Sequence, residues 1–288
     1  MAGPLHWCLV DGRRLPLAEA RISPLDRSFL FGDGIYEVMP VYGGRLFRPR
    51  LHFDRLARSA AALRIPNPHG HAQWEALLRE LVSANGGGDQ YVYLHLSRGA
   101  EHGRNHAPLP QVPPLVFCYS SPWPVPAAGT LRDGLACITA EDTRWARCDI
   151  KSVALLANVM LRQLAVDAGA NETILLRDGE LMEASASTVH VVRGGMLLTP
   201  PNSTRILPGT SRIVVEELAD ALGIARRDSP VSEAQLRSAD EIWLAAATRE
   251  VQPVTRLDGR PVGGGRPGPL WRRVYEAWQQ LKSDPSRY

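Results

Sequence analysis

The sequence predicts an α+β protein built from two domains. Its predicted strands cluster with helices beside them and do not alternate regularly with helices. The segment 121–127 carries three prolines at alternate positions, which favours an extended connector between compact parts. We therefore expect an N-terminal α/β domain at residues 1–120, a Pro-rich linker at 121–127 and a C-terminal domain at 128–288.

The composition is typical of a globular protein and excludes several functional classes. Of 288 residues, 44% are hydrophobic and 22% are charged, the net charge is +3, and the arginines are scattered along the chain. No basic cluster indicates a nucleic-acid partner, and no apolar run approaches the roughly 18 residues of a membrane helix. The expected partners are therefore small molecules, with neither nucleic acid nor membrane.

The four cysteines indicate neither a metal site nor a disulfide framework. Cys8, Cys118, Cys137 and Cys148 show no CxxC spacing and no pairing. The first ten residues lack the basic stretch followed by an apolar one that a secretory signal has. We expect no bound metal and a reducing, cytoplasmic location.

Residues 1–120 predict two helices among several strands. Pro49 suits the first position of a helix, and Gly43-Gly44 supplies positive φ for a hairpin turn before it. Alternating side chains predict that the strand at 90–97 is buried on at least one face. The expected elements are a strand that enters a turn at 10–13, strands at 33–42, 90–97 and 115–120, and helices at 50–63 and 72–84.

Residues 128–288 predict a second group of strands with helices beside them. Val153, Leu156, Met160 and Leu164 lie on one stripe of the helix predicted at 152–168, which indicates an amphipathic helix. Asp-Gly and Gly-Gly pairs provide the hairpin turns between the next strands. The expected elements are strands at 135–139, 173–176, 180–183, 189–192, 196–199 and 241–247, and helices at 152–168, 209–222 and 271–282.

Lys151 is the first candidate for chemistry. It precedes an apolar helix, and it and Lys282 are the only lysines in a chain rich in arginine. Desolvation among apolar neighbours destabilises an ammonium group and makes the amine a candidate for Schiff-base chemistry, which arginine cannot perform. The alternative is an ordinary solvated lysine at the start of a helix.

Two later segments could bind a cofactor. Glu183 stands at a strand end before the small residues 184–188, and a carboxylate beside a pyridine nitrogen would keep that nitrogen protonated. Thr210 and Ser211 follow Gly209 and open a helix whose N–H groups and hydroxyls suit a phosphate. The alternatives are a surface turn of small residues and ordinary helix capping.

Basic side chains in the first half could bind anions. Arg55 lies in the first long helix, where it could reach an anion or pair with Asp54 or Asp26. Arg104 and His106 stand two residues apart in a loop, where both could face one carboxylate. The alternative for this pair is a polar surface loop.

Together and in this order, these segments resemble the class IV family of pyridoxal 5'-phosphate (PLP) aminotransferases. The resemblance implies fold type IV, in which two α/β domains place the active site at their interface. It spans about residues 7–281 and is strongest to the bacterial D-amino acid aminotransferases, whose Arg-x-His pair is matched by Arg104-Asn105-His106. The other matching segments are Asp26-Arg27-Ser28-Phe29-Leu30-Phe31-Gly32-Asp33-Gly34-Ile35-Tyr36-Glu37-Val38, His52-Phe53-Asp54-Arg55-Leu56, Arg147-Cys148-Asp149-Ile150-Lys151, Glu183-Ala184-Ser185-Ala186-Ser187 and Leu207-Pro208-Gly209-Thr210-Ser211-Arg212.

The resemblance implies that the C-terminal domain binds PLP. Lys151 would hold the cofactor covalently and move the substrate proton, and Glu183 would face the pyridine nitrogen. Leu207 would pack against the ring. The implied phosphate-binding residues are Arg55, Thr210 and Ser211.

The resemblance also implies a trap for the substrate α-carboxylate. Tyr36, Arg104 and His106 would form it, and in this family the trap is completed across a homodimer interface. The position of the trapped carboxylate would then decide which enantiomer presents its hydrogen to Lys151.

Three departures from the family pattern concern phosphate and substrate binding. Ala245-Ala246-Ala247 stands where the family usually has Ser and Thr. Thr248 would supply a remaining donor to the cofactor, and Arg249 could bind a substrate carboxylate. The loop that holds Arg104 is one residue longer than the pattern, so Arg98 competes with Arg104 for the carboxylate.

The implied reaction is ping-pong transfer of an amino group between D-amino acids, such as D-alanine and D-glutamate, and 2-oxo acids. Alternatives on the same fold are a branched-chain L-amino acid transaminase, an (R)-amine transaminase and an aminodeoxychorismate lyase-like enzyme. A PLP-binding protein without turnover is the non-enzymatic alternative. The presence of both Lys151 and Glu183 argues against it, because storage needs neither a proton shuttle nor a partner for the ring nitrogen.

Overall fold

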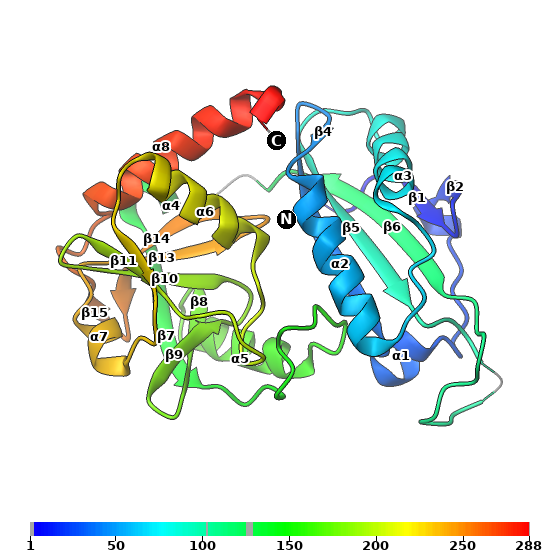
Figure 1. The fold of residues 1–288 in the computed structure, drawn as a ribbon, viewed down its shortest axis with the longest axis horizontal. Coiled ribbons are helices and arrows are strands. Elements are labelled where there is room, and N and C mark those ends of the chain that lie inside the picture. The colour runs from blue at the N-terminus through cyan, green and yellow to red at the C-terminus, as the bar shows by residue number, and fades with distance from the viewer. Residues whose placement is uncertain (1–2, 102, 125–128, 288) are drawn as a thin grey trace. The chain divides into compact units, whose positions relative to one another are not determined.

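The computed structural model describes residues 3–101, 103–124 and 129–287, and its chain divides into two compact units (Figure 1). The first unit comprises the described parts of Met1–Pro124, Ile150–Leu155 and Pro285–Tyr288. The second comprises those of Val125–Asp149 and Leu156–Asp284. Each unit has its own sheet and its own apolar core, which confirms the expected α+β class.

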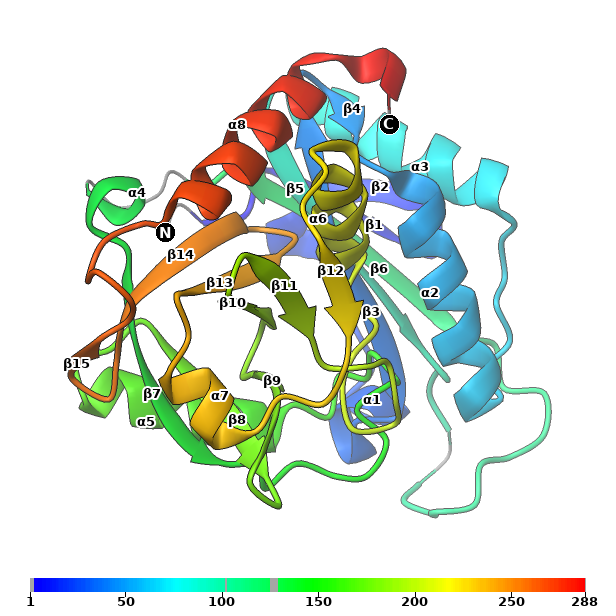
Figure 2. The ribbon, with the colours of Figure 1, turned by 60° about the vertical axis from the view of Figure 1, so that its left-hand side comes forward.

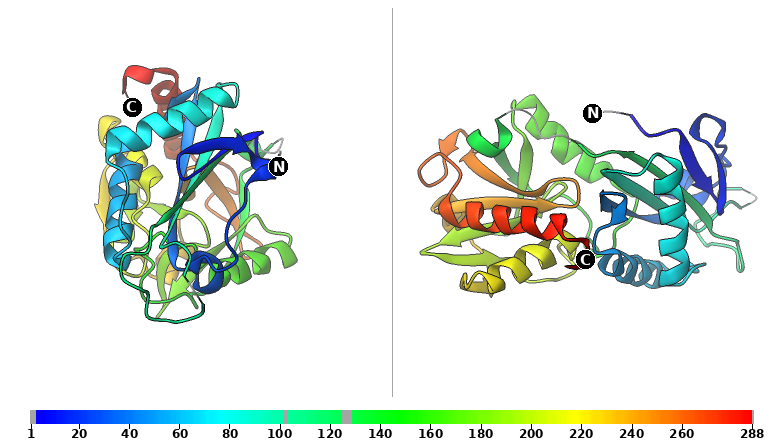
Figure 3. Two further views of the ribbon diagram at one scale, coloured as in Figure 1. Left: turned by 90° about the vertical axis from the view of Figure 1, so that its right-hand side faces the viewer. Right: turned by 90° about the horizontal axis from the view of Figure 1, so that it is seen from above.

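The described part of the first unit forms a six-stranded antiparallel sheet with two long helices along one face (Figure 3). Its elements are β1 Trp7–Val10, β2 Arg13–Pro16, η1 Leu17–Glu19, α1 Arg27–Phe31, β3 Gly34–Tyr42, β4 Arg45–Leu46, α2 Pro49–Leu63, α3 His71–Ala84, β5 Gln90–Ser97, β6 Leu115–Pro122 and η2 Pro285–Arg287. The strand order is β2-β1-β6-β5-β3-β4.

Apolar side chains of α2 and α3 close the core of the first unit. Phe53 and Leu56 on α2, and Trp74 and Leu78 on α3, are at most 1% exposed and belong to the same cluster as the inward residues of β3, β5 and β6. Pro49 opens α2 at its first position, where the missing N–H has no helical partner to lose. The predicted elements of residues 1–120 are thus confirmed to within a few residues at their ends.

The described part of the second unit forms a mixed nine-stranded sheet (Figure 2). Its elements are α4 Thr130–Asp133, β7 Leu135–Glu141, α5 Leu156–Asp167, β8 Glu172–Arg177, β9 Glu180–Ala184, β10 Thr188–Arg193, β11 Met196–Thr199, α6 Thr210–Ala221, β12 Arg226–Asp228, α7 Glu233–Arg237, β13 Glu241–Ala246, β14 Glu250–Leu257, β15 Arg260–Pro261 and α8 Pro269–Ser283. The strand order is β12-β11-β10-β13-β14-β7-β8-β9, and β15 pairs with β14. The strand β7 runs parallel to both of its neighbours, and α6 and α8 pack against β13 and β14.

The prediction for the helix at 152–168 is wrong in its start, and the predicted apolar stripe is not the buried side of the helix. The helix α5 begins at Leu156, because residues 151–153 are extended and pair with β3. Its buried residues are Leu161 and Ala165, whereas Leu156 is 75% and Met160 is 64% exposed. The apolar stripe predicted from the sequence therefore faces outward in a single chain.

The expected domain boundary differs from the division seen in the structure. The strand β6 continues through Pro122, since Ser121 and Pro122 pair with Tyr91 and Gln90 of β5. The first unit reaches Pro124, and residues 125–127 of the expected linker lie outside the described residues. Lys151, expected in the domain at 128–288, belongs to the first unit because its segment bonds to β3.

In the parts of the chain that the structure describes, no helix has both the length and the hydropathy that crossing a bilayer requires.

Candidate active site

The backbone around Lys151 is fixed against the first unit's sheet. The Tyr36 N–H donates to the Lys151 carbonyl and the Val153 N–H donates to the Gly34 carbonyl, each at 3.0 Å. The Lys151 N–H donates to the buried hydroxyl of Ser59 on α2 at 3.2 Å. These bonds place the Lys151 Nζ 4.1 Å from the centre of the Tyr36 ring, in cation–π contact.

A buried cluster of charged residues lies behind this segment. Arg55 donates from Nε and Nη2 to the two Glu37 oxygens at 2.8 and 2.7 Å, and His52 Nδ1 lies 2.7 Å from Glu37 Oε2. Glu37 is on β3, whereas the other two are on α2, and all three are at most 4% exposed. Neither Asp54 nor Asp26, the partners considered from the sequence, pairs with Arg55 in the contacts seen here; the guanidinium instead neutralises a carboxylate on β3.

Opposing effects set the protonation of this cluster. Burial alone would raise the pKa of Glu37, but the charge and hydrogen bonds of Arg55, with the hydrogen bond of His52, hold it at about 2. Burial lowers the pKa of His52, against the raising effect of Glu37. A neutral His52 facing an ionised carboxylate must carry its proton on Nδ1, because the carboxylate only accepts.

A chain of polar and aromatic side chains supports Tyr36. Its ring stacks on Tyr93, with centroids 5.7 Å apart. Tyr93 Oη lies 3.2 Å from His95 Nδ1, His95 Nε2 lies 3.1 Å from Ser28 Oγ, and Ser28 Oγ donates to Asp26 at 2.6 Å. Since Asp26 only accepts, the directions follow: Ser28 accepts from His95 Nε2–H, and Tyr93 donates to His95 Nδ1.

Arg104 and His106 gather around one aromatic ring. The Arg104 guanidinium carbon lies 5.2 Å, and the His106 ring centre 5.6 Å, from the centre of the Phe31 ring. Buried Arg27 holds their loop by donating to the carbonyls of Asn105 and His106 at 2.6 and 2.9 Å. No hydrogen bond or ion pair engages the Arg104 guanidinium within the described residues, which leaves it available to an anion.

Arg98 is engaged by the protein itself. Its Nε and Nη2 donate to Asp33 at 2.7 and 3.0 Å, and its Nη2 and Nη1 donate to the carbonyls of Leu63 and Arg64 at 2.7 and 3.0 Å. All three guanidinium nitrogens therefore have acceptors in the fold. This geometry favours a structural role for Arg98, whereas the sequence left it level with Arg104.

Glu183 lies in the second unit, at the end of β9. Its Oε1 accepts from Arg144 Nη1 at 2.5 Å and from the Leu207 N–H at 3.1 Å, and its side chain is 8% exposed. Oε2 accepts no hydrogen bond from any described residue. Burial raises the pKa of this carboxyl, and the Arg144 guanidinium opposes the rise.

Arg144 is a residue that the sequence did not single out. It donates to both oxygens of Asp142, from Nε at 2.8 Å and from Nη2 at 2.9 Å, and Arg177 lies 2.9 Å from the same carboxylate. The spacing Asp142-x-Arg144 beside a strand end is the only signal in the sequence, and it does not indicate a partner 39 positions away.

The N-terminus of α6 presents hydroxyls without protein partners. Thr210 and Ser211 are buried in its first turn, and neither side chain makes a hydrogen bond among the described residues. Ser187 Oγ is likewise buried with no partner. A Cβ on Gly209 would lie 2.6 Å from Thr188 Oγ1, so glycine keeps this approach open. Unpartnered donors at a helix N-terminus fit a phosphate, as the resemblance implies for PLP.

Thr248 and Arg249 stand in the turn between β13 and β14. Arg249 donates to Glu172 Oε2 and Gln252 Oε1, both at 3.3 Å, and Glu172 also accepts from Ser185. Arg249 thus pairs with a carboxylate of its own unit. The sequence had left this guanidinium open for a substrate carboxylate. Thr248 is half-buried beside it.

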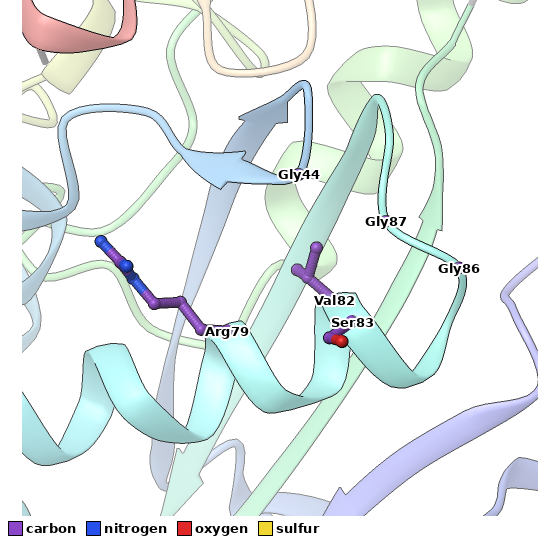
Figure 4. Close-up of a pocket in the computed structure, with 6 residues that line it drawn as sticks. All are labelled: Gly44, Arg79, Val82, Ser83, Gly86 and Gly87. Carbon is purple, nitrogen blue, oxygen red and sulfur yellow. The ribbon is translucent and has the colours of Figure 1, made fainter.

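A pocket of about 350 Å³ lies apart from these residues (Figure 4). It is bounded by Gly44, Arg79 and Val82, with Ser83, Gly86 and Gly87, at the C-terminal end of α3. None of the sequence-predicted site residues lines it, so it has no part in the candidate site.

Comparison with known proteins shows which family the chain belongs to. A family model described as Amino-transferase class IV matches residues 34–257. The D-alanine aminotransferase of Bacillus licheniformis is 39% identical over 271 residues, which cover 94% of this chain and 95% of that protein. The branched-chain amino acid aminotransferase of Escherichia coli superposes with a TM-score of 0.92 at 25% identity, over 96% of this chain and 94% of that one.

A second solved structure, the T.th. branched-chain amino acid aminotransferase with pyridoxamine 5'-phosphate, gives a TM-score of 0.91 at 27% identity, over 98% of this chain and 96% of that one. The family model spans Tyr36, Lys151 and Glu183, and the fold is type IV. The chain therefore belongs to the class IV aminotransferases, which are PLP-dependent enzymes.

Proposed function

We propose that this enzyme transfers amino groups between D-amino acids, such as D-alanine and D-glutamate, and 2-oxo acids. The observation that carries the proposal is Lys151, held by backbone hydrogen bonds beside Tyr36, in a chain 39% identical to a D-alanine aminotransferase. The unengaged guanidinium of Arg104, two residues from His106, supports an amino acid substrate because it provides a cation for the α-carboxylate.

Each side chain has a defined task toward the cofactor and the substrate. Bound PLP supplies an aldehyde carbon and a protonated ring that withdraws electrons from the substrate Cα. Lys151 Nζ binds the cofactor and carries the proton taken from Cα. Glu183 holds the proton of the ring nitrogen through Oε2, the oxygen that no described residue engages. Leu207, whose N–H donates to Glu183, would pack its side chain against the ring.

The donors assigned to the phosphate of PLP are Arg55, Thr210, Ser211 and Thr248. Thr210 and Ser211 offer hydroxyls and the free N–H groups of the α6 N-terminus. Arg55 adds positive charge through a guanidinium that also pairs with Glu37. Thr248 adds one further hydroxyl where Ala245-Ala246-Ala247 removes others.

The substrate carboxylate is assigned to Tyr36, Arg104 and His106. Arg98 is less suited, because Asp33 and two carbonyls already accept from it. Arg249 is less suited, because Glu172 and Gln252 accept from it. The sequence left three arginines open for the substrate carboxylate, and the proposal assigns it to Arg104.

A branched-chain L-amino acid transaminase is the second candidate. The solved structures with TM-scores of 0.92 and 0.91 are branched-chain enzymes, but their identity to this chain is 25% and 27%, against 39% for the D-alanine enzyme. The deciding experiment mixes purified PLP-bound protein with one amino donor and follows the visible absorption band of the cofactor. We expect D-alanine and D-glutamate to bleach it, and L-leucine and (R)-1-phenylethylamine to leave it unchanged.

Each other outcome assigns a different activity to this protein. Bleaching by L-leucine alone indicates the branched-chain enzyme, and bleaching by the amine indicates an (R)-amine transaminase. Conversion of a chorismate-derived substrate without amino transfer indicates a lyase. A stable band with every donor of either hand indicates PLP binding without turnover. Each of these results contradicts the proposal.

We further propose that the active form is a homodimer. The apolar side of α5 supports this: Leu156, Val159, Met160, Leu164 and Val166 are each at least 46% exposed in the single chain. Such a patch on one helix is seldom left in water by a monomer. A second copy of this chain is the partner that we assign to it.

We assign the enzyme to the cytoplasm. The support is its cysteines: Cys8, Cys118, Cys137 and Cys148 are buried free thiols, as is usual for a protein kept in a reducing compartment. Amino acids and 2-oxo acids, its expected partners, are small soluble metabolites.

A further inference from the structure

Four charged side chains of the second unit form a buried chain of alternating sign. Arg177 contacts Asp142, Asp142 contacts Arg144, and Arg144 contacts Glu183, at distances between 2.5 and 2.9 Å. Their side chains are at most 17% exposed, and Asp142 is fully buried. Charges removed from water in this way are costly unless each has a partner of opposite sign. Each of these four side chains has at least one such partner within the group.

The guanidinium of Arg144 is fixed at all three nitrogens. Nε and Nη2 donate to the two oxygens of Asp142, and Nη1 donates to Glu183. Nη2 also lies 3.3 Å from the carbonyl of Arg205, two residues before Leu207. A planar group held at three corners cannot rotate without breaking several charged hydrogen bonds.

This arrangement leaves one oxygen of Glu183 for an outside group. Oε1 accepts from Arg144 and from the Leu207 N–H, whereas Oε2 accepts from no described residue. The alternating chain ends in this carboxylate. The group that continues the pattern is a positively charged N–H donor, and the protonated ring nitrogen of PLP has that chemistry.

We propose that Arg144 is a positioning residue for the cofactor ring: it fixes Glu183 so that Oε2 meets the protonated pyridine nitrogen. This inference rests on the proposed function. Arg144 itself touches neither cofactor nor substrate in this assignment; it acts through the carboxylate. By the bond to the Arg205 carbonyl, it also anchors the loop that carries Leu207 toward the ring.

The electrostatics of the site agree with this role. Burial raises the pKa of Glu183, Arg144 opposes the rise, and Asp142 adds to it. The Leu207 N–H also favours the ionised form, and the Cys148 thiol is the other titratable group that faces Glu183. Loss of Arg144 would raise the pKa of Glu183 further, and a protonated carboxyl attracts a pyridinium less strongly.

The test compares two ligands that differ only at the ring nitrogen. Binding of PLP and of its carbocyclic analogue, in which C–H replaces the nitrogen, is measured in the whole protein by fluorescence titration. We expect the wild type to prefer PLP, and Arg144→Met to lose PLP affinity by about tenfold or more while binding of the analogue changes by less than about twofold. Arg144→Lys should restore part of the preference, because it restores the charge without the planar fork.

Two variants serve as controls. Arg226→Met removes a guanidinium that binds Asp220 through Nε and Nη2 at 2.7 and 2.8 Å on the surface, and it should leave both affinities unchanged. Glu183→Gln combined with Arg144→Met should bind PLP no more weakly than Glu183→Gln alone. Full additivity of the two losses would contradict the inference, because Arg144 would then act independently of Glu183.

The remaining outcomes are equally decisive. An equal loss for PLP and analogue, or an unchanged preference, assigns Arg144 a purely structural role and overturns the inference. If Arg144→Met does not fold, the double variant Asp142→Asn/Arg144→Met measures the same ratio of PLP to analogue affinity, and it also removes the Asp142 charge that Arg177 alone would have to balance. If the wild type binds no PLP, the proposed function fails. The pKa of Glu183, measured by carbon-13 NMR in cofactor-free protein, then decides the positioning: we expect Arg144→Met to raise it by about one pH unit, and no rise contradicts it.

Discussion

Backbone hydrogen bonds between distant segments fix the positions of single residues in this enzyme. Lys151 is the clearest case: the peptide groups around it bond to β3 and to Ser59 on α2. The side chain therefore emerges beside Tyr36 on a rigid backbone. In the proposed function this side chain is the catalytic amine, and its position does not depend on α5, because that helix starts only at Leu156.

Replacement of Lys151 tests this placement directly. We expect Lys151→Ala to abolish transamination and covalent PLP binding, because Lys151 supplies the amine. The measurement is peptide mapping after borohydride reduction, together with the absorption spectrum. Lys282→Ala is the matched control: it removes the other lysine, which pairs with Glu250 at 2.8 Å, and it should retain both properties. A reduced adduct that persists in Lys151→Ala would show that another amine holds the cofactor.

The Glu37 cluster predicts a specific dependence of stability on pH. The folded pKa of Glu37, about 2, lies below the ordinary value of 4.5, so its contribution is complete above pH 4.5 and is lost as the pH falls toward 2. The contribution is about 3 kcal/mol. We expect Glu37→Gln to lower the free energy of unfolding by about 3–5 kcal/mol, since it leaves Arg55 buried without its carboxylate.

Urea denaturation at several pH values measures this effect. The wild type should lose stability between pH 4.5 and 2 more steeply than Glu37→Gln, because the variant lacks the titrating group. Parallel pH profiles for the two proteins would contradict the assignment of the ion pair.

Candidate residues could be identified from their chemistry, whereas their partners in the fold could not. The rarity of lysine and the Glu183 segment both marked groups that the structure anchors. The partner of Arg55 was missed, because Glu37 lies 18 positions away on a strand. Arg144 was missed for the same reason: its bond to Glu183 joins residues 39 positions apart, and no local pattern indicates it.

At the scale of elements, the proposed function assigns substrate binding to the loop around Arg104 and phosphate binding to the start of α6. Arg27 donates to the carbonyls of Asn105 and His106 beside Arg104, and Arg98, at the start of the same loop, donates to Asp33. The two arginines that the sequence could not separate thus differ in environment, one engaged by acceptors of the fold and the other stacked on Phe31.

Two alanine variants in this loop should have different consequences. We expect Arg104→Ala to raise the KM for D-amino acids about 10- to 100-fold with a smaller change in kcat, because it removes a charged hydrogen bond to the substrate. Arg98→Ala should instead lower stability by about 2–3 kcal/mol, because it leaves Asp33 and two carbonyls without a donor. Steady-state kinetics and thermal denaturation measure the two effects. The reverse assignment of losses would place the carboxylate at Arg98.

The start of α6 predicts a steric effect. We expect Gly209→Ala to weaken PLP binding, because its Cβ would lie 2.6 Å from Thr188 Oγ1 and displace the first turn of the helix. The φ of Gly209 is −71°, so backbone strain does not contribute. Thr188→Ala in the same chain should restore part of the affinity, measured by equilibrium titration with PLP. Equal affinity of Gly209→Ala and wild type would exclude a role of this turn in phosphate binding.

Elements with strong periodicity were predictable, and short ones were not. The strand at 90–97 has the predicted ends, since alternation marks it, and the strand at 196–199 has them because a Gly-Gly turn precedes it. Elements of five residues or fewer, such as α1, α7 and β12, have too few residues to show a period. The late start of α5 follows from a tertiary effect, the pairing of Ser152 with Ile35, that helix propensity does not reveal.

At the scale of the whole molecule, the apolar side of α5 bears on assembly. The sequence predicted an apolar stripe on this helix, and a single chain leaves Leu156, Met160 and Leu164 of that stripe exposed. Burial against a second copy would satisfy the same pattern, because periodicity reports that a side is apolar and not which chain covers it.

A charge on this side of α5 should separate the protomers. We expect Met160→Glu to shift the protein from dimer to monomer in sedimentation velocity, since it places a carboxylate in an apolar interface. Gln280→Glu adds the same charge to an exposed position of α8 and should leave the dimer intact. A wild type that sediments as a monomer at micromolar concentration contradicts the dimer. An unaffected Met160→Glu dimer places the interface elsewhere.

Stereochemical preference is the central claim, and the half-reaction of the PLP-bound enzyme measures it most directly. Purified protein is mixed with paired D- and L-forms of alanine, glutamate and leucine, and the cofactor band is followed over time. We predict that D-alanine and D-glutamate remove the band and that all three L-forms leave it in place. Removal of the band by an L-amino acid, with the D-form inert, would contradict the account.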